Sequence, residues 1–491
     1  MLRLLPFAAA AAADTCGALS IDGSAAVHTL APYYASFNID SSTDREFFML
    51  RFDDPALLAA AAGLSTGGGS HVRFGGTGNN ALTYAVPGAP PCQPKGSGHT
   101  CLNESHWRGV AGLAAAAQSP IIFGVNFFPG GKSSNATFDP TNAVQFFTWA
   151  LQAGLPPIWG VENGNEINRL VTAEQQAAGL LALDDALARV YGASPRPVLI
   201  GPDALGLHSL IAPPGAIPTG VILKYLTDFV AAMKGRLRAV THHEYIEINA
   251  TNVLEPAFMD TTLQLANAVV AAVRVVSATV EVWAGEVGPH NGEGGPGDGR
   301  LGNCSGNKVC GRWGSALWYA DSMASKALAG YAAYCRQDFV GADYGLLNFT
   351  TLAPAPDYWL LVLWKRLVGA RVLSIATPPA DPLVRAYAFC GARAPGTVAV
   401  LLVHLGTAPA CVDPPGIADP TQPRLEYALT PTEGTVESPG AALNGGAPLA
   451  LGAGGALPPL EGKAVPAGAP IILAPLSVTI VEIRSSVAAC A

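Results

Sequence analysis

Short apolar segments alternate with helix-like segments through most of this chain, and this alternation restricts the fold more than any other feature of the sequence. Apolar runs at 119–126 and 155–161 are each followed by a longer run of helical character, at 139–152 and 172–191. Alternating strands and helices are typical of parallel βαβ units, which form a closed barrel or an open sheet. The pattern extends over residues 40–370, so this region is predicted to be an α/β domain.

The pattern changes after residue 371, where strand-like runs are separated by Pro- and Gly-rich loops without helices. These runs lie at 384–389, 397–405, 425–429 and 476–483. They predict an appended antiparallel β-sandwich over residues 371–491. We expect the strand-like runs of residues 16–39 to join the same sandwich and bring the two ends of the chain together. A chain of 491 residues is long enough for two such domains.

Two strands of the first region end in a carboxyl group. Glu166 follows an amide residue, Asn165, and Glu286 follows Gly285, each after an apolar run. A carboxyl group can protonate a leaving oxygen and an amide can hydrogen-bond a sugar hydroxyl, as cleavage of a glycosidic bond requires. Barrel enzymes place their chemistry at the C-terminal ends of the strands. We therefore favour a (β/α)8 TIM barrel over an open sheet and predict that Glu166 and Glu286 face each other across a sugar.

Other residues compete for these roles. Glu162 and Glu244 lie in the same kind of strand, and we expect both to support the barrel through hydrogen bonds. His242 and His243 could suggest a metal pair, but adjacent residues on a strand face opposite ways. We favour one histidine lining the cleft, assigned to His243 as a substrate-binding residue, and one buried. No metal site and no cofactor are predicted.

The net charge of −8 argues against nucleic acid, and against a tightly held polyanion, as a partner. Residues 1–15 fit a short secretory signal, with an apolar and alanine-rich run after one arginine. No later apolar run is long enough to span a bilayer. We therefore expect a monomer that is secreted or held in a lysosome- or vacuole-like compartment, has no integral membrane segment, and is open to association with a membrane surface.

The nine cysteines also favour an oxidising compartment. Metal binding by them is the poorer interpretation, because no CxxC or HxxxH spacing occurs. Two pairs flank short loops and are expected to be local disulfides: Cys92 with Cys101, and Cys304 with Cys310. Cys390 could bind Cys490, and three cysteines stay unassigned: Cys16, Cys335 and Cys411. Five N-glycosylation sequons agree with secretion: Asn103, Asn135, Asn249, Asn303 and Asn348.

A series of short runs stands in a characteristic order along the chain. They are VRFGGT at 72–77, FGVN at 123–126, GNE at 164–166, THH at 241–243 with Tyr245, GE at 285–286, YCRQ at 334–337, YGLL at 344–347, PDY at 356–358 and VAAC at 487–490. On these runs the chain resembles the heparanase-like glycoside hydrolases of family 79, and the plant heparanase-like proteins most closely. No single run is specific, but their joint order is.

The resemblance implies a (β/α)8 barrel with an appended β-sandwich and a retaining mechanism. Glu166 would be the acid/base and Glu286 the nucleophile, with Tyr245 hydrogen-bonded to the nucleophile. The remaining substrate-binding residues implied are Asp40, Thr77 and Asn165 at the sugar hydroxyls, Tyr344 with the backbone N–H groups of Gly294 and Gly295 at a glucuronate carboxylate, and Gln337 along the subsite. The implied partner is a glycan or glycoside that contains glucuronic acid. The basic clusters of the animal members are absent, so heparan is not expected as the substrate.

Three functions therefore remain open. The first is a secreted retaining β-glucuronidase, which we favour. The second is a non-catalytic glycan-binding relative, against which the presence of both glutamates argues. The third is a hydrolase of the same clan that acts on a neutral sugar. Arg336 is expected to hold a carboxylate in place, and the tryptophans to be core residues as often as sugar platforms.

Overall fold

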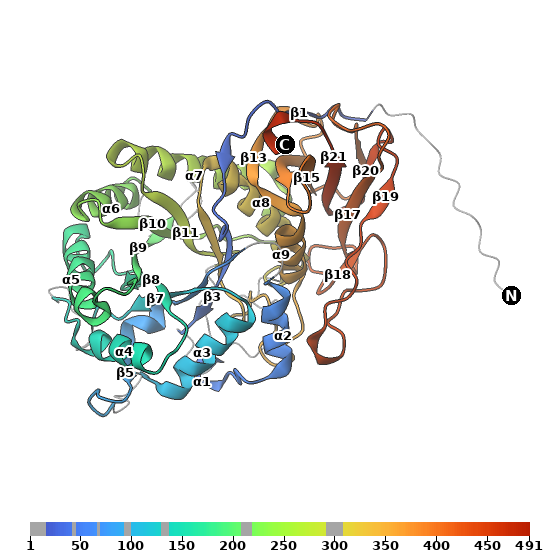
Figure 1. Cartoon of the computed structure of the whole chain (residues 1–491). Coiled ribbons are helices and arrows are strands. Elements are labelled where there is room, and N and C mark those ends of the chain that lie inside the picture. Colours follow the sequence, from blue (N-terminus) through green and yellow to red (C-terminus); the bar gives the residue numbers. More distant parts are fainter. Residues whose placement is uncertain are drawn as a thin grey trace.

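The computed structural model describes residues 16–41, 46–65, 69–92, 100–128, 137–207, 219–290 and 308–491. Its larger part is a closed barrel of eight strands, each parallel to its neighbours (Figure 1). In chain order the strands are β3 (Ala35–Asp40), β4 (Val72–Gly75), β7 (Ile121–Val125), β8 (Ile158–Asn163), β9 (Val198–Leu207), β10 (Leu237–Tyr245), β11 (Glu281–Gly288) and β12 (Ala333–Arg336). The predicted TIM barrel is thereby confirmed.

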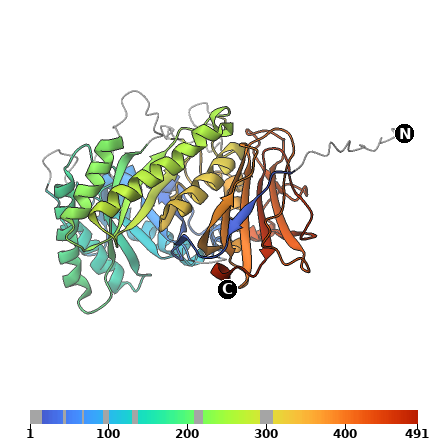
Figure 2. The same cartoon turned by 90° about the horizontal axis from the view of Figure 1, so that it is seen from above.

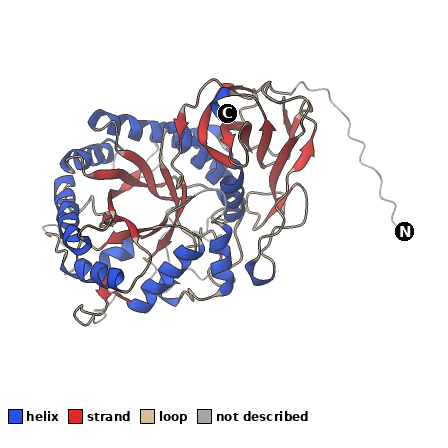
Figure 3. Ribbon diagram, viewed as in Figure 1, coloured by secondary structure: helices blue, strands red, loops and turns tan. Residues whose placement is uncertain are grey.

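Helices cover the outside of the barrel (Figure 3). They are α2 (Pro55–Gly63), α3 (Glu104–Ala116), α4 (Thr141–Gln152), α5 (Ala173–Tyr191), α6 (Thr219–Ala232), α7 (Pro256–Val276), α8 (Trp313–Ala329) and α9 (Pro356–Leu367), with a short α1 (Glu46–Met49) before α2. Several helices begin at residues that cap the free backbone N–H groups of the first turn. Thr172 begins α5 with a reciprocal capping box to Gln175, because the side chain of each residue bonds the backbone N–H of the other. A small pair, β5 (Leu82–Ala85) and β6 (Thr100–Asn103), lies beside the barrel.

Aromatic rings fill the N-terminal end of the barrel. The ring of His71 stacks on Trp159 at a centroid distance of 4.1 Å, and Trp159 stacks on Trp283 at 5.9 Å. Burial lowers the pKa of His71 to about 3, so this imidazole is neutral and packs as an apolar ring. Because this end is plugged, the two tryptophans are core residues, and the polar residues at the opposite end of the strands form the mouth of the barrel.

The second part is a nine-stranded antiparallel sheet beside the barrel (Figure 2). Its strands are β1 (Ser20–Asp22), β2 (His28–Thr29), β13 (Val368–Thr377), β14 (Val384–Gly391), β15 (Thr397–His404), β17 (Arg424–Pro431), β18 (Ala441–Leu443), β19 (Lys463–Val465) and β21 (Val478–Arg484). A two-stranded ribbon, β16 (Ala410–Val412) with β20 (Ile471–Leu473), forms the second layer.

Strand β15 is buried along its whole length because the sheet is covered on both faces. Val400 and Leu402 belong to the core that the sheet shares with the ribbon, which includes Ile471. Leu401 lies on the opposite face and joins the barrel core, which includes Trp364 of α9. Alternation along one strand therefore joins the sandwich to the barrel through an apolar interface.

The expected boundary at residue 40 lies inside a strand. Strands β1 and β2 pair antiparallel with β13 in the sheet, whereas β3 pairs parallel with β4 and β12 in the barrel. Residues 35–39 therefore belong to the barrel and not to the sandwich. The sequence could not separate these runs, because a short buried strand looks alike in both kinds of sheet.

Disulfides tie the segments of the sandwich together. Cys390 bonds Cys490 as expected, and Cys16, which the sequence left unassigned, bonds Cys411. The local pair Cys92–Cys101 is also formed, whereas Cys335 is free and buried in β12. The expected signal segment and Cys304, Asn135 and Asn303 lie outside the described residues. Among the residues that the structure describes, no helix has the length and apolar character needed to cross a membrane.

Candidate active site

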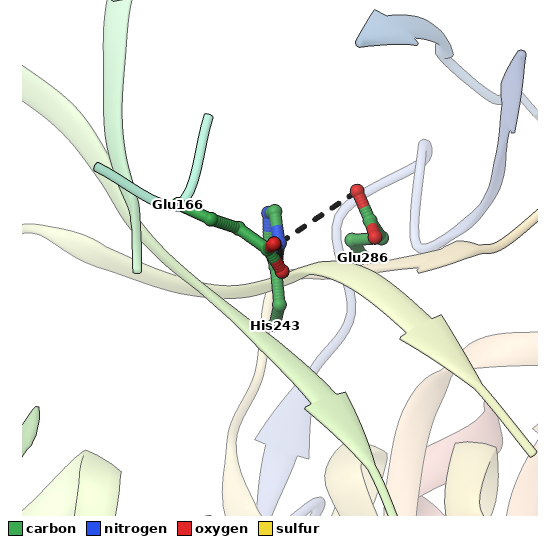
Figure 4. Close-up of side chains that lie close together, drawn as sticks. All are labelled: Glu166, His243 and Glu286. Carbon is green, nitrogen blue, oxygen red and sulfur yellow. Dashed lines mark hydrogen bonds and ion pairs between the residues drawn. The ribbon is translucent and has the colours of Figure 1, made fainter. Parts of the chain in front are cut away.

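Glu166 and Glu286 meet at the mouth of the barrel, one from the turn after β8 and the other from β11. Together with His243 of β10 they offer donor atoms that all lie within 4.8 Å of one another (Figure 4). One carboxyl oxygen of each glutamate therefore lies within 4.8 Å of the other, and retaining glycosidases hold such groups about 5–5.5 Å apart.

The backbone turns sharply to bring Glu166 into this position. Gly164 has φ +82° and Glu166 itself has φ +55°, a left-handed conformation that non-glycine residues rarely adopt. The Glu166 N–H donates a hydrogen bond to the carbonyl of Asp203 at 2.9 Å, which fixes the strained residue. Such strain costs on the order of 1–3 kcal/mol and is found mainly at functional sites.

Glu286 accepts a hydrogen bond on each carboxyl oxygen. The Tyr245 hydroxyl donates to Oε1 at 2.5 Å, and Arg73 Nη1 donates to Oε2 at 3.1 Å. Burial and the charge of Glu286 keep the pKa of Tyr245 well above its ordinary value, so this residue remains a donor. Gly288 makes room for the tyrosine ring, because a Cβ there would lie 2.4 Å from Tyr245 Cε1.

Glu166 has a different environment. Its Oε1 lies 2.9 Å from His243 Nδ1, and its side chain is 18% exposed against 7% for Glu286. The neighbouring Asn165 is clamped by Asn80, whose amide bonds both the backbone carbonyl and the backbone N–H of Asn165. The Nδ2 of Asn165 is buried and has no hydrogen-bond partner among the described residues. A sugar hydroxyl could satisfy this donor.

A buried network of charges connects the two carboxyl groups. Arg73 is 1% exposed and donates to Glu162 and to Asp203, both at 2.8 Å. Burial alone would lower the pKa of His243, but the carboxylates of Glu286, Asp203 and Glu166 outweigh it and raise this pKa to about 10. His243 is therefore a cation at neutral pH, like Arg73.

The buried carboxyl groups of the network differ in protonation. Burial raises the pKa of Glu162 well above its usual range, and this effect outweighs the opposing pull of Arg73. Burial also acts to raise the pKa of Asp203, but Arg73 and His243 reverse it and hold that pKa well below its usual range. Burial thus favours the neutral form of Glu162, whereas the two cations favour the ionised form of Asp203.

The same cluster is poorly suited to a metal ion. Glu166, His243 and Glu286 have the spacing of a ligand set. Arg73, however, already places a guanidinium 3.1 Å from Glu286. A histidine must also be neutral to bind a metal, and the raised pKa of His243 opposes this. The arrangement suits catalysis by two carboxyl groups rather than by a bound cation.

Four further predicted residues lie around the mouth of the barrel. Gln337 hydrogen-bonds Asp40 through Nε2 and accepts a hydrogen bond from Asn38 at 2.8 Å. The ring of Tyr344 lies 6.2 Å from that of Tyr245. Thr77 is exposed at the start of the short helix η1 (Thr77–Ala81), directly after β4. Gly294 and Gly295 lie outside the described residues.

The two adjacent histidines of β10 point to opposite sides, as expected of neighbouring strand residues. Both are buried, with His243 1% exposed and His242 0% exposed. His243 faces the catalytic carboxyl groups, whereas His242 points away and contacts the hydroxyl of Tyr331 at 2.8 Å. The carboxyl groups of Glu166, Asp203 and Glu286 lie 2.9–3.6 Å from the His243 ring, and the role of His243 in substrate binding stays a prediction.

The competing polar residues have structural partners. Glu244 accepts a hydrogen bond from Lys326 of α8 at 2.6 Å, and both side chains are fully buried. Arg336 pairs with Asp357 and donates to the backbone carbonyl of Tyr344 at 2.9 Å. Both pairs fasten the barrel wall, and the second also fixes the segment that carries Tyr344.

Sequence reasoning missed Asp203 and Asn80. Asp203 follows the apolar run 198–200, as the two glutamates follow apolar runs, and this pattern was the available signal, although β9 continues to Leu207. Asn80 follows a Gly turn after β4, where nothing local points to Asn165. The contacts of Asp203 with Arg73 and of Asn80 with Asn165 exist only after closure of the barrel has brought distant segments together.

Comparisons with known proteins agree with this geometry. The model of glycosyl hydrolase family 79, N-terminal domain, matches residues 47–324. Heparanase-like protein 3 of Arabidopsis thaliana is 27% identical over 477 residues, which cover 86% of this chain and 82% of that protein. Baicalin-beta-D-glucuronidase of Scutellaria baicalensis is 25% identical over 414 residues, which cover 76% of this chain and 73% of that protein.

A solved structure shows the same fold. The 4-O-alpha-L-rhamnosyl-beta-D-glucuronidase from Fusarium oxysporum 12S superposes with a TM-score of 0.64 over 95% of this chain and 99% of that chain. The sequence identity is 14%, so this likeness concerns the barrel and its appended sheet alone.

Proposed function

Because the chain belongs to glycosyl hydrolase family 79 and is therefore a glycoside hydrolase, we propose that it cleaves β-glucuronide linkages with retention of configuration. The observation that carries this proposal is the approach of Glu166 to Glu286, because one carboxyl oxygen of each lies within 4.8 Å of the other. Retaining enzymes hold these groups about 5–5.5 Å apart, whereas inverting enzymes leave about 6.5–9.5 Å for a water molecule. The short spacing favours double displacement.

In the first step, protonated Glu166 donates its proton to the glycosidic oxygen as the bond from that oxygen to the anomeric carbon breaks. Ionised Glu286 supplies the electron pair for a new ester bond to the same carbon. In the second step, Glu166, now a carboxylate, takes a proton from water, and the water oxygen displaces Glu286. Arg73 and Tyr245 assist both steps by favouring the carboxylate form of Glu286.

A glucuronide is supported as the substrate by the relatives named above and by the donors near the cleft. The substrate carboxylate has to lie beside two catalytic glutamates, so it needs hydrogen-bond donors. Burial, with the charges of Asp338 and Asp40, keeps the pKa of Tyr344 well above its ordinary value, and its hydroxyl remains a donor. We assign this hydroxyl, with the N–H groups of Gly294 and Gly295, to the carboxylate.

The test is hydrolysis of a matched panel of aryl β-D-glycosides by the purified protein. We expect turnover of the glucuronide at least about 100-fold above the glucoside and galactoside, because unpaired polar groups penalise the wrong sugar strongly. The first product detected by proton NMR should be the β-anomer. Glu166→Gln and Glu286→Gln should each abolish release of glucuronic acid from an alkyl glucuronide.

Two results would replace the proposal. Preferred turnover of the glucoside or galactoside would identify a hydrolase of a neutral sugar. Binding of glucuronic-acid-containing glycans without turnover of any glycoside would identify a non-catalytic relative. An α-anomer as first product would contradict the retaining mechanism directly.

We also propose that the protein is a monomer that works in an oxidising compartment, outside the cell or in a vacuole-like organelle. The disulfides Cys16–Cys411 and Cys390–Cys490 support this, because such bonds rarely persist in a reducing cytosol. Expression in a eukaryotic host should yield the protein in the medium, with sensitivity to an N-glycosidase. Full retention inside the cells would contradict it. Light scattering coupled to size exclusion tests the oligomeric state.

A further inference from the structure

Asp203 links the two catalytic carboxyl groups from within the barrel wall. It lies in β9, next to the strands that carry His243 and precede Glu166, and is 1% exposed. Its Oδ2 accepts a hydrogen bond from Arg73 Nη2 at 2.8 Å, and its Oδ1 lies 3.4 Å from His243 Nε2. Its backbone carbonyl accepts the hydrogen bond from the Glu166 N–H at 2.9 Å.

The two cations beside Asp203, Arg73 and His243, also contact the catalytic carboxyl groups. Arg73 Nη1 lies 3.1 Å from Glu286 Oε2. His243 Nδ1 lies 2.9 Å from Glu166 Oε1 and 3.6 Å from Glu286 Oε2. Each of these contacts therefore connects Asp203 to a catalytic carboxyl group through a single intervening residue, either Arg73 or His243.

The backbone around Asp203 is built to hold this position. Asp203 has φ +55°, and its N–H donates a hydrogen bond to Thr241 Oγ1 at 2.8 Å. Gly285 passes so close that a Cβ there would lie 3.1 Å from Asp203 Oδ1. A strained residue held by a side chain of the neighbouring strand β10 indicates a demand on geometry at this point.

Asp203 also contributes a negative charge to a cluster of charged groups. Other titratable groups interact with Asp203 or His243 from the surrounding strands and the turn after β8: Arg73, Glu162, Glu166, His242, Glu286 and Cys335. Because burial favours the neutral form of Glu162, the two cations mainly face two carboxyl groups besides Glu166, those of Asp203 and Glu286. Without Asp203 one positive charge would be left over, and it would favour loss of the Glu166 proton.

We propose that Asp203 is a positioning residue for the hydrolysis proposed above, which holds Arg73 and His243 in place so that Glu166 keeps its proton while Glu286 stays ionised. The proposal rests on the assigned roles of the two glutamates. It adds that a carboxylate outside the reacting pair determines which of the two carries the proton.

The test compares Asp203→Asn with the wild-type enzyme. The amide oxygen of asparagine can accept a hydrogen bond from Arg73 or from His243. Because the amide is neutral, it cannot balance the positive charge of either residue. We expect kcat to fall on the order of 10²-fold, because a small misplacement of catalytic groups has this effect, while KM changes less than about threefold. In a plot of kcat/KM against pH, the decline on the alkaline side should begin at a lower pH, because Glu166 loses its proton more readily. In NMR spectra of labelled histidine, the titration of His243 should move down by at least about one pH unit.

The matched control is Asp184→Asn. Asp184 is also a buried aspartate with two arginine partners, Arg196 and Arg236, but it lies on α5 away from the mouth. It should lower stability without shifting the pH profile. An unchanged pH profile and His243 titration in Asp203→Asn, or an equal shift in Asp184→Asn, would overturn the proposal.

If Asp203→Asn does not fold, a milder variant tests the same proposal. Thr241→Val removes the hydrogen bond that holds the Asp203 backbone while it keeps every charge, and it should lower kcat with little change in KM. An unaltered kcat would overturn the proposal. All rates are measured on whichever aryl glycoside the wild-type enzyme hydrolyses. If it hydrolyses none, the proposed function fails, and the His243 titration alone still decides whether Asp203 controls this network.

Discussion

The Nδ1 atom of His243 lies 2.9 Å from the Oε1 atom of Glu166, so a buried imidazole touches the residue assigned as the acid/base. Carboxylates around it raise the pKa of His243 to about 10, although burial opposes this. The ring is therefore an imidazolium throughout the neutral range. Its charge stabilises the carboxylate form that Glu166 takes after it has given up its proton.

This charge makes stability depend on pH. The pKa of His243 is raised in the folded state, so its contribution is complete below the unfolded value of about 6.5 and is lost as the pH rises towards 10. Between these values the free energy of unfolding should fall by up to about 1.4 kcal/mol per pH unit. Urea unfolding at pH 7, 8 and 9 measures this slope, and His243→Gln should show a shallower one. Equal slopes in both proteins would contradict a charged His243.

Loss of the Tyr245 hydroxyl should weaken the nucleophile. A hydrogen bond to a charged group contributes about 1.5–3 kcal/mol, so Tyr245→Phe should lower kcat/KM about 10- to 100-fold. Tyr331→Phe is the control, because it removes a buried hydroxyl that contacts His242 and neither glutamate. Steady-state kinetics on an aryl glycoside measure both variants. A similar loss in the two would show that the effect is structural.

The two glutamates should differ in their response to the leaving group. Glu166→Gln removes the proton donor, whose contribution is about 10²–10⁴-fold, but a dinitrophenyl leaving group needs no protonation. We expect this variant to keep glycosylation of a dinitrophenyl glycoside and to lose that of an alkyl glycoside. Glu286→Gln should lose both. Stopped-flow release of dinitrophenol measures the first step, and a reversed pattern would exchange the assigned roles.

The buried pair Lys326–Glu244 should support stability rather than catalysis. Lys326→Met leaves a fully buried carboxylate without its cation and should lower the free energy of unfolding by about 3–5 kcal/mol. Adding Glu244→Gln should recover part of this loss. Lys224→Met is the matched control, since Lys224 pairs with Asp228 at the same distance of 2.6 Å but is 74% exposed. Lys224→Met should change the free energy of unfolding by less than about 1 kcal/mol. Denaturant unfolding of Lys326→Met and Lys224→Met measures the difference.

Local patterns predicted the barrel, the appended sheet and the family, and the match to residues 47–324 confirms the last of these. They also indicated which ends of the strands carry carboxyl groups. They misplaced residues 35–39, left Cys16 without its partner Cys411, and gave no sign that Asp203 contacts Arg73. Each of these depends on contacts between segments that are far apart in the sequence.

The amino-acid sequence by itself determined the order of strands and helices and the position of Glu166 and Glu286 at strand ends, because periodicity and turn residues act over a few neighbours. Only the tertiary structure decided which charges surround those glutamates. Arg73, Asp203 and His243 come from three different strands, and their protonation follows from burial and from charges a few ångströms away. Electrostatic interactions depend on distance in space and on exclusion of water, and neither exists before the barrel closes.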